Sequence, residues 1–336
     1  MGKTNLLDAV YYLCLTRSHR NLPDKHLIRH DASFFRLEGV FETGENERTR
    51  VVAKFAAGQR KEIERNGTAY NRLTDYIGQF PVVMIAPDDI SLVQEGSEER
   101  RRFLDNTLSQ IYPDYLYNLL IYNNLLKQRN ALLKSFAEQR RFDPALLEGI
   151  DRQMPAPAEV LARKRETFAA AFVPLFQEMY TAIAGSHEQV AVRFESDCTE
   201  TGLAALLIAN LEKDRALERT AAGPHRDDLS LSLNGQAVKK YASQGQLKSF
   251  LLAMRLAQYE VLRRESGRAP LLLLDDIFDK LDALRVHQLI ALLLHREFGQ
   301  IFITDTQRNR IEAVVSTFSG AYQIFEVENG QIAVVG

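Results

Sequence analysis

Leu271-Leu272-Leu273-Leu274-Asp275-Asp276 is the stretch that decides the fold of this chain. Four consecutive apolar residues are typical of a strand buried on both faces, as in a parallel sheet covered by helices. Proteins that hydrolyse nucleotides need a carboxylate at the tip of such a strand to hold Mg²⁺, and an adjacent carboxylate can orient the attacking water. The stretch therefore predicts an α/β fold in which Asp275 serves the metal and Asp276 is catalytic. The alternative is a strand-end turn with two solvated acids.

The start of the chain carries a second pattern of the same kind. Met1-Gly2-Lys3-Thr4-Asn5-Leu6-Leu7 matches the end of the phosphate-binding loop G-x-x-x-x-G-K-[ST] and the start of its helix. An apolar stripe at helical spacing continues to about Leu15, and the first N–H groups of such a helix favour an anion. The first glycine of the loop and the strand before it are missing from the pattern. We therefore expect a chain truncated inside this loop, which binds ATP poorly unless the missing segment is restored.

A third segment, Ser243-Gln244-Gly245-Gln246, precedes the best-defined helical pattern in the chain. A small hydroxyl residue and a glycine at a helix start let backbone N–H groups approach a phosphate closely. An ordinary N-cap is the alternative. Two anion-binding helix starts and one magnesium-type strand suggest a single nucleotide clamped by both, within one molecule or across a dimer.

Changes in hydrophobic period predict the remaining elements. Residues 35–70 alternate apolar and polar side chains around Asn66-Gly67, which indicates a small antiparallel sheet. Residues 97–185 are helical, with Ser97 as a candidate cap. Further strands are expected at 82–86, 190–195, 229–233 and 301–304, further helices at 244–265 and 283–295, and a hairpin at 323–335. We expect a head formed by residues 1–96 and 189–336, with an inserted helical subdomain at 97–188.

Composition limits the classes of function. The chain has 336 residues, 46% hydrophobic and 26% charged, with a net charge of −2, so DNA contact would need a local basic patch. Cys14 and Cys198 form no disulfide framework, and no apolar run approaches the ~20 residues that span a bilayer. We therefore expect a cytoplasmic protein without a membrane partner. His26 and His30 have the spacing of metal ligands but lack a third ligand nearby.

Basic residues in the helical segment are the candidates for DNA contact. Arg100, Arg101 and Arg102 form a run that could touch a phosphate backbone, or could pair with neighbouring acids such as Glu98, Glu99 and Asp105. A wider set gives the same segment a basic character compatible with a DNA surface: Lys127, Arg129, Lys134, Arg140, Arg141, Arg163, Lys164 and Arg165.

Several motifs together resemble the RecF family of bacterial recombination-mediator ATPases, of the ABC/SMC-like class, over essentially the whole chain. Residues 2–9 resemble the end of that family's Walker A loop, and residues 271–276 its Walker B strand. Ser243–Gln246 resembles the ABC signature and Asp279–Asp282 the D-loop. The more specific pieces are Pro87-Asp88-Asp89-Ile90-Ser91-Leu92-Val93 with Arg100–Asp105, and Gly223-Pro224-His225-Arg226-Asp227-Asp228-Leu229.

The resemblance implies an α/β ABC-type ATPase head, with a mixed sheet flanked by helices, an antiparallel β subdomain and an inserted helical subdomain. It implies binding of ATP with Mg²⁺, an ATP-dependent homodimer, and slow hydrolysis in the presence of DNA. It further implies binding to gapped, single- and double-stranded DNA in recombinational repair and replication-fork maintenance, where RecR and RecO are partners in loading RecA.

The resemblance also implies roles for particular residues. Lys3 would contact the β- and γ-phosphates, Thr4 and Asp275 would serve Mg²⁺, and Asp276 would polarise the attacking water. The remaining nucleotide contacts implied are Gly2, Asn5, Ser243, Gln244, Gly245, Gln246 and Asp282, the last at the dimer seam and the signature residues acting on the γ-phosphate of the partner molecule.

Other interpretations stay open. A transporter ATPase subunit is disfavoured by the long gap between the first pattern and the signature, and by Asp305-Thr306 where such subunits carry a switch histidine. A short SMC-type structural ATPase is disfavoured because the insert lacks heptads. A third possibility is a chain that binds DNA or a partner without hydrolysing ATP, since an incomplete loop offers fewer N–H groups to the phosphates.

Overall fold

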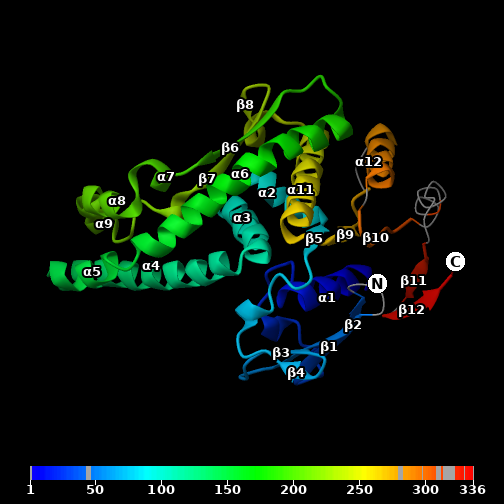
Figure 1. Cartoon of the computed structure of the whole chain (residues 1–336), viewed down its shortest axis with the longest axis horizontal. Coiled ribbons are helices and arrows are strands. Elements are labelled where there is room, and N and C mark those ends of the chain that lie inside the picture. Colours follow the sequence, from blue (N-terminus) through cyan, green and yellow to red (C-terminus); the bar gives the residue numbers. More distant parts are fainter. Residues whose placement is uncertain are drawn as a thin grey trace. The chain divides into compact units, whose positions relative to one another are not determined.

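The computed structural model describes residues 2–42, 47–278, 283–296, 298–307, 312, 322–328 and 330–335. The chain forms two compact units. Figure 1 shows the whole chain, coloured from the N-terminus in blue to the C-terminus in red. The first unit combines residues 1–89 with residues 262–336, and the second is the continuous segment 90–261. Residues 189–261, which the sequence-based division grouped with the head, thus belong to the second unit.

The first unit holds two sheets, one terminal hairpin and the helix that follows the Gly-Lys-Thr pattern. Its helices are α1 (Lys3–Leu15), η1 (Asp24–His26), η2 (Leu73–Asp75) and α12 (Ala283–His295), with η3 (Pro87–Ile90) at its boundary. Its strands are β1 (Phe34–Glu42), β2 (Arg48–Ala56), β3 (Glu62–Arg65), β4 (Thr68–Ala69), β5 (Val82–Ile85), β9 (Leu271–Asp275), β10 (Ile301–Thr304), β11 (Phe325–Glu328) and β12 (Gln331–Val334).

The antiparallel sheet predicted for residues 35–70 is confirmed. Strands β1 to β4 form a four-stranded sheet in chain order, with every neighbouring pair antiparallel. Asn66 and Gly67 join β3 to β4 with φ of 50° and 83°, the left-handed pair that a two-residue hairpin turn requires. Asn66 also accepts a hydrogen bond from the Arg50 backbone N–H at 2.8 Å, which ties the turn to β2.

The three apolar runs predicted as buried strands form one parallel sheet in the order β10-β9-β5. Leu272, Leu273 and Leu274 in the central strand β9 have no exposed surface. Full burial of one such leucine contributes roughly 1.5–3 kcal/mol, which explains why a run without polar residues occupies the centre. Helix α1 packs against this sheet and against the antiparallel sheet, and its Leu7 and Tyr12 lie in their shared core. The start of α1 is thereby placed near the carboxyl ends of β9 and β10.

The second unit is mainly helical. Its helices are α2 (Ser91–Gln94), α3 (Ser97–Ile111), α4 (Pro113–Gln139), α5 (Pro144–Asp151), α6 (Pro155–Ala184), α7 (Cys198–Thr201), α8 (Leu203–Ala209), α9 (Leu211–Leu217), η4 (Pro224–Arg226) and α10 (Val238–Tyr241). Helix α11 (Gln244–Ser266) begins in this unit and ends at residues of the first. Its strands β6 (Val190–Glu195), β7 (Asp228–Leu233) and β8 (Gln236–Ala237) form an antiparallel sheet.

Proline punctuates the long helices as the sequence indicates. Helices α4, α5 and α6 each begin at a proline, where a missing N–H costs no intrahelical bond, and α6 ends at Gly185 with a φ of 83°. Helices α4 and α6 pack against each other, and α6 runs at an angle to α4 (Figure 1). The prediction of Ser97 as a cap is wrong, because Gly96 takes the N-cap position and Ser97 is the first helical residue. Among the residues described, no helix is long and apolar enough to cross a membrane.

Candidate functional site

The hydroxyl of Thr4 and the carboxylate of Asp275 meet in the first unit. Thr4 Oγ1 donates a hydrogen bond of 3.1 Å to Asp275 Oδ1, although 271 residues separate the two in the chain. Thr4 lies in the first turn of α1, and Asp275 is the last residue of the central strand β9. The helix packs over the parallel sheet, and this packing brings together the two patterns that the sequence places at opposite ends of the chain.

The start of α1 has the conformation of a loop entering a helix. Gly2 occupies the N-cap position with a φ of 122°, a value that L side chains rarely adopt. Its carbonyl accepts the first helical hydrogen bond from the Leu6 N–H at 3.0 Å. Lys3 is partly exposed, and its ammonium group makes no hydrogen bond or ion pair within the described ranges. The first turn of α1, which carries Lys3 and Thr4, thus begins next to a buried carboxylate, an arrangement suited to a phosphate and its metal ion.

Thr304, at the end of β10, is a site residue that sequence reasoning missed. Its Oγ1 donates to Asp275 Oδ1 at 2.7 Å, so two threonine hydroxyls hold the same carboxylate oxygen. The parallel register pairs Thr304 with Asp275 directly. The sequence did contain a signal for Thr304, a hydroxyl residue at the end of a predicted buried strand. Parallel strands place their carboxyl ends at one edge of the sheet, so such a residue lies near the carboxylate that ends the neighbouring strand.

Asp276 follows β9 in a left-handed conformation. Its φ is 48°, in the left-handed region. Residues other than glycine adopt this region uncommonly, and asparagine and aspartate adopt it more often than most. The Asp276 N–H holds this conformation by donating to the Thr304 carbonyl at 3.1 Å and to Thr304 Oγ1 at 3.2 Å. The turn directs the chain away from the strand immediately after Asp275. The catalytic role of Asp276 stays a prediction.

The site fits a hard cation. Asp275 is 4% exposed, and in the part of the chain that is described no hydrogen bond reaches its Oδ2. One carboxylate and a threonine hydroxyl are the ligands that a protein offers to Mg²⁺ when phosphates and water complete the octahedron. No group of three or more His, Cys, Asp or Glu side chains able to hold a metal lies among the described residues, which include His26 and His30.

Ser243–Gln246 begins α11 in the second unit and forms a reciprocal cap. Ser243 Oγ accepts from the Gln246 N–H at 3.3 Å, and Gln246 Oε1 accepts from the Ser243 N–H at 2.7 Å. The Gln246 side chain also donates to Glu188 Oε1 at 2.7 Å. The segment is therefore an N-cap, and a role toward phosphate stays a prediction. Asp282 and the rest of Asp279–Asp282 lie outside the described residues.

Five of the basic residues predicted for DNA contact divide into three kinds. Arg129 and Arg165 are 0% and 2% exposed, so their assignment to a basic surface is wrong; both bind buried acids inside the second unit. Arg100 and Arg102 are paired, Arg100 with Asp228 and Arg102 with Glu98 and Glu99. Arg101 alone in the triplet contacts no carboxylate, and donates to the Asp227 carbonyl at 2.8 Å.

A second polar cluster lies beside the first unit's core and was also missed. Asp8 in α1 accepts from the Ser18 hydroxyl and from the His19 N–H, each at 2.7 Å. His19 Nε2 lies 2.9 Å from Asp89 Oδ1, and Asp89 Oδ2 accepts from the Ala86 N–H at 3.1 Å. The motif residue Asp89 thus ties the end of β5 to the loop after α1, a structural role.

These features define a class of protein. Helix α1 starting at Gly-Lys-Thr, the parallel sheet and the strand-end carboxylates have the fold of the ABC-type ATPase heads found in SMC proteins. The Smc head domain of Pyrococcus furiosus with an extended coiled coil, 15% identical, has this fold with a TM-score of 0.52 over 99% of the present chain and 87% of that one.

Sequence relatives narrow the class to a family. The DNA replication and repair protein RecF of Phocaeicola vulgatus is 43% identical over 333 residues, which cover 99% of this chain and 89% of that protein. A solved structure of the recombination mediator protein RecF-ATP in the RecFOR pathway, 25% identical, superposes with a TM-score of 0.87 over 100% of this chain and 89% of the other. No family model matches the chain. This chain belongs to the RecF family of DNA replication and repair proteins.

Proposed function

We propose that this chain binds ATP with Mg²⁺ at the start of α1 and uses the nucleotide state to control its binding to DNA. The observation that carries the proposal is the hydrogen bond between Thr4 and Asp275, because it joins a phosphate-loop residue to a strand-end carboxylate. Membership of the RecF family and the RecF-ATP structure support it. On this proposal the chain is a DNA-dependent ATPase of recombinational repair.

The chain's own groups have distinct roles in this proposal. The Lys3 ammonium binds the β- and γ-phosphate oxygens, and the N–H groups at Gly2 to Asn5 bind the same anion. Thr4 and Asp275 hold Mg²⁺, which when bound neutralises phosphate charge. Asp276 orients the attacking water, and its backbone bonds to Thr304 fix the direction in which its carboxylate points.

The signature residues complete the site in the homodimer we propose. Ser243 and Gly245 would close on the γ-phosphate held by the partner molecule, with Gln244 and Gln246 beside them and Asp282 at the seam between the two molecules. The capping contact of Ser243 supports this role, since it presents the first N–H groups of α11 in a fixed geometry.

The proposed DNA substrate is a gap that exposes single-stranded beside double-stranded DNA. RecR and RecO would be the partners through which the chain directs RecA loading. This part of the proposal is supported by the structural neighbour, a RecF protein described as acting in the RecFOR pathway. Membership of a DNA replication and repair family agrees with DNA as the substrate.

Titration with a fluorescent ATP analogue, with and without Mg²⁺, tests the nucleotide site. Lys3→Ala should weaken affinity by about 10- to 100-fold, the range for losing a charge-assisted hydrogen bond. Thr4→Val keeps the shape of the side chain and removes the hydroxyl, so it should abolish the gain in affinity on adding Mg²⁺. Asp31→Asn, an exposed acid in the same unit paired only with Arg29, is the matched control and should bind as the wild type does. Equal affinities of wild type and Lys3→Ala would contradict the proposal.

A further inference from the structure

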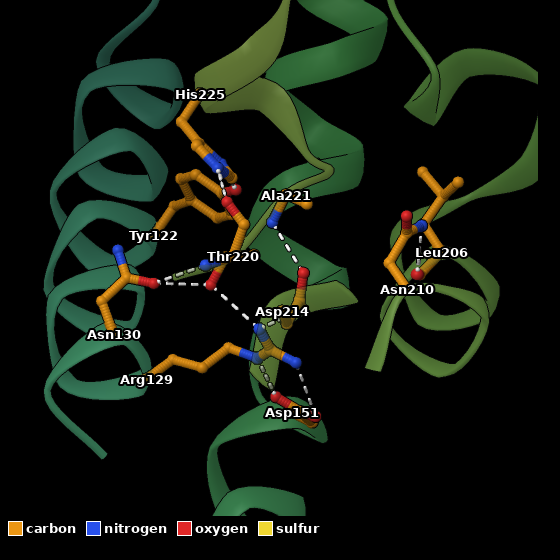
Figure 2. Close-up of polar contacts among 10 residues, drawn as sticks. All are labelled: Tyr122, Arg129, Asn130, Asp151, Leu206, Asn210, Asp214, Thr220, Ala221 and His225. Atoms are coloured by element: carbon orange, nitrogen blue, oxygen red, sulfur yellow. Dashed lines mark hydrogen bonds and ion pairs between the residues drawn. The ribbon is translucent and has the colours of Figure 1, made fainter. Parts of the chain in front are cut away.

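The segment from Thr220 to Asp228, which joins α9 to β7, is held by two buried arginines. Arg165 of α6 donates from Nη1 to the Pro224 carbonyl at 2.6 Å and to Asp227 Oδ2 at 2.7 Å. Arg129 of α4 donates to Thr220 Oγ1 at 2.9 Å and to Asp214 at 2.5 Å (Figure 2). The segment is therefore anchored at both ends by fully enclosed charges.

Between those anchors, His225 fixes the middle of the segment. His225 Nε2 lies 3.0 Å from the Thr220 carbonyl, which can only accept, so this nitrogen carries the proton. Nδ1 then accepts from the Tyr122 hydroxyl at 2.7 Å (Figure 2). Gly223 makes this contact possible, because its φ is 135° and a Cβ there would lie 2.5 Å from the Tyr122 oxygen. The turn η4 is thus held by hydrogen bonds from both nitrogens of His225.

Arg226 is the exposed exception in this segment. Ala222, Gly223, Pro224 and Asp227 around it are buried, whereas the Arg226 side chain faces solvent. Within the described ranges its guanidinium makes no hydrogen bond or ion pair. A rigid backbone therefore presents an arginine whose charge nothing in the unit neutralises.

Arg101 lies beside this arginine. Its Nη1 donates to the carbonyl of Asp227, the residue that follows Arg226. Burial lowers the pKa of Arg101; Asp228 opposes this, and the nearby charges of Arg165 and Arg226 add to it. The neighbouring arginines differ, since Arg100 binds both oxygens of Asp228 at 2.7 and 2.8 Å. Two arginine charges thus lie near each other without a carboxylate hydrogen-bonded to either, since Asp228 is bound by Arg100, and an added anion would stabilise both charges.

We propose that Arg101 and Arg226 form a subsite for a phosphate group. A planar guanidinium matches two phosphate oxygens, and the fixed backbone at η4 removes most of the ordering cost of binding. The phosphate belongs either to the DNA backbone or to the nucleotide, and the two sources share this chemistry. The inference rests on the proposed function, which supplies both ligands.

Arg226→Gln is the decisive variant, because the side chain is exposed and no described residue pairs with it, so that the substitution should not disturb folding. Fluorescence anisotropy of a labelled gapped duplex, repeated over a series of salt concentrations, measures the DNA arm. Loss of one phosphate contact should weaken binding about eightfold at 0.1 M salt and lower the salt slope by about 0.9. Arg101→Gln, which removes the second positive charge, should have a similar effect. Titration of the same proteins with the fluorescent ATP analogue measures the nucleotide arm.

The matched control is Arg102→Gln, on the same helix but paired with Glu98 and Glu99, which should change neither arm. Weaker DNA binding alone assigns the subsite to a backbone phosphate, and weaker nucleotide binding alone assigns it to ATP. If Arg226→Gln binds both ligands as the wild type does, the subsite is overturned while the proposed function stands. If the wild type binds neither ligand, the proposed function fails, and the subsite fails with it.

Discussion

At the scale of single residues, the pKa of His225 is set by the groups packed around it. It lies between Tyr122 of α4 and the Thr220 carbonyl, and the positive charges of Arg101, Arg129 and Arg226 act on it. Burial, reinforced by these positive charges, lowers its pKa from 6.5 to about 4. The folded chain therefore keeps this histidine neutral at a pH where the unfolded chain protonates it.

This difference predicts a loss of stability in mild acid. Below pH 6.5 His225 is protonated in the unfolded state, whereas in the folded state it stays neutral until the pH nears 4. The free energy of unfolding therefore falls as the pH falls through this window. Between pH 7.5 and 5 the loss from His225 should be about 2 kcal/mol. Urea unfolding at both pH values measures it. His225→Gln should lack this component and the exposed control His187→Gln should keep it; identical pH dependence in all three proteins would refute the assignment.

Single residues of the site were predictable where chemistry leaves few choices. Gly-Lys-Thr and a carboxylate after an apolar strand point to phosphate and metal, and the structure places Thr4 on Asp275. Thr304 was missed because its role depends on strand order, which places β10 beside β9. Arg129 and Arg165 were assigned to the surface because a charged residue on a helix is usually solvated. Only the tertiary packing reveals that acids accompany them inside.

At the scale of elements, Arg129 joins three helices of the second unit. Reaching from α4, it contacts Asp151 at the end of α5 and Asp214 in α9 (Figure 2). Arg129 and Asp214 have no exposed side-chain surface. A buried ion pair costs much desolvation energy to form. Replacing one partner alone therefore destabilises the protein more than replacing both, because it leaves the other charge buried without a partner.

A double-mutant cycle tests this account of how the helices are joined. Arg129→Met leaves Asp214 buried without its cation and should destabilise the chain by about 3–5 kcal/mol. Adding Asp214→Leu should recover part of that loss, since the fully buried charge is then removed and only the partly exposed Asp151 has lost its partner. Urea unfolding provides the free energies. Arg152→Gln, which breaks an exposed pair with Glu148, is the control and should cost under about 1 kcal/mol. Additive effects of the two core substitutions would contradict the coupling.

The periodicity of apolar residues predicted well which segments are helices and which are strands. It did not predict which elements belong to the same compact unit. Strand β6 and helix α12 have the predicted bounds, because apolar spacing and turn residues are local signals. The sheet of β6, β7 and β8 was assigned to the head, whereas here it packs on α3 and α6. Which helices cover a sheet depends on contacts across the chain, and no local pattern contains that information.

At the scale of the whole molecule, the prediction concerns assembly. If Asp276 orients the water and ATP joins two copies, Asp276→Asn should slow hydrolysis and leave binding intact, so that an ATP-bound dimer accumulates. Light scattering after size exclusion, with and without ATP and Mg²⁺, measures the mass directly. Thr4→Val, which weakens metal binding, should stay monomeric under the same conditions. A monomeric Asp276→Asn protein with ATP bound would sink the dimer proposal.

The central position of β9 also constrains the order in which the protein takes shape on the ribosome. Helix α1 and strand β5 emerge early, but β9, which lies beside both, does not begin until Leu271, long after β5 ends at Ile85. The segment 90–261 is synthesised in between and has a core of its own. It can therefore fold while the early apolar surfaces of α1 and β5 still await β9. Until then those surfaces are available to chaperones or to misassociation, and the pairing of Thr4 with Asp275 arises only late in synthesis.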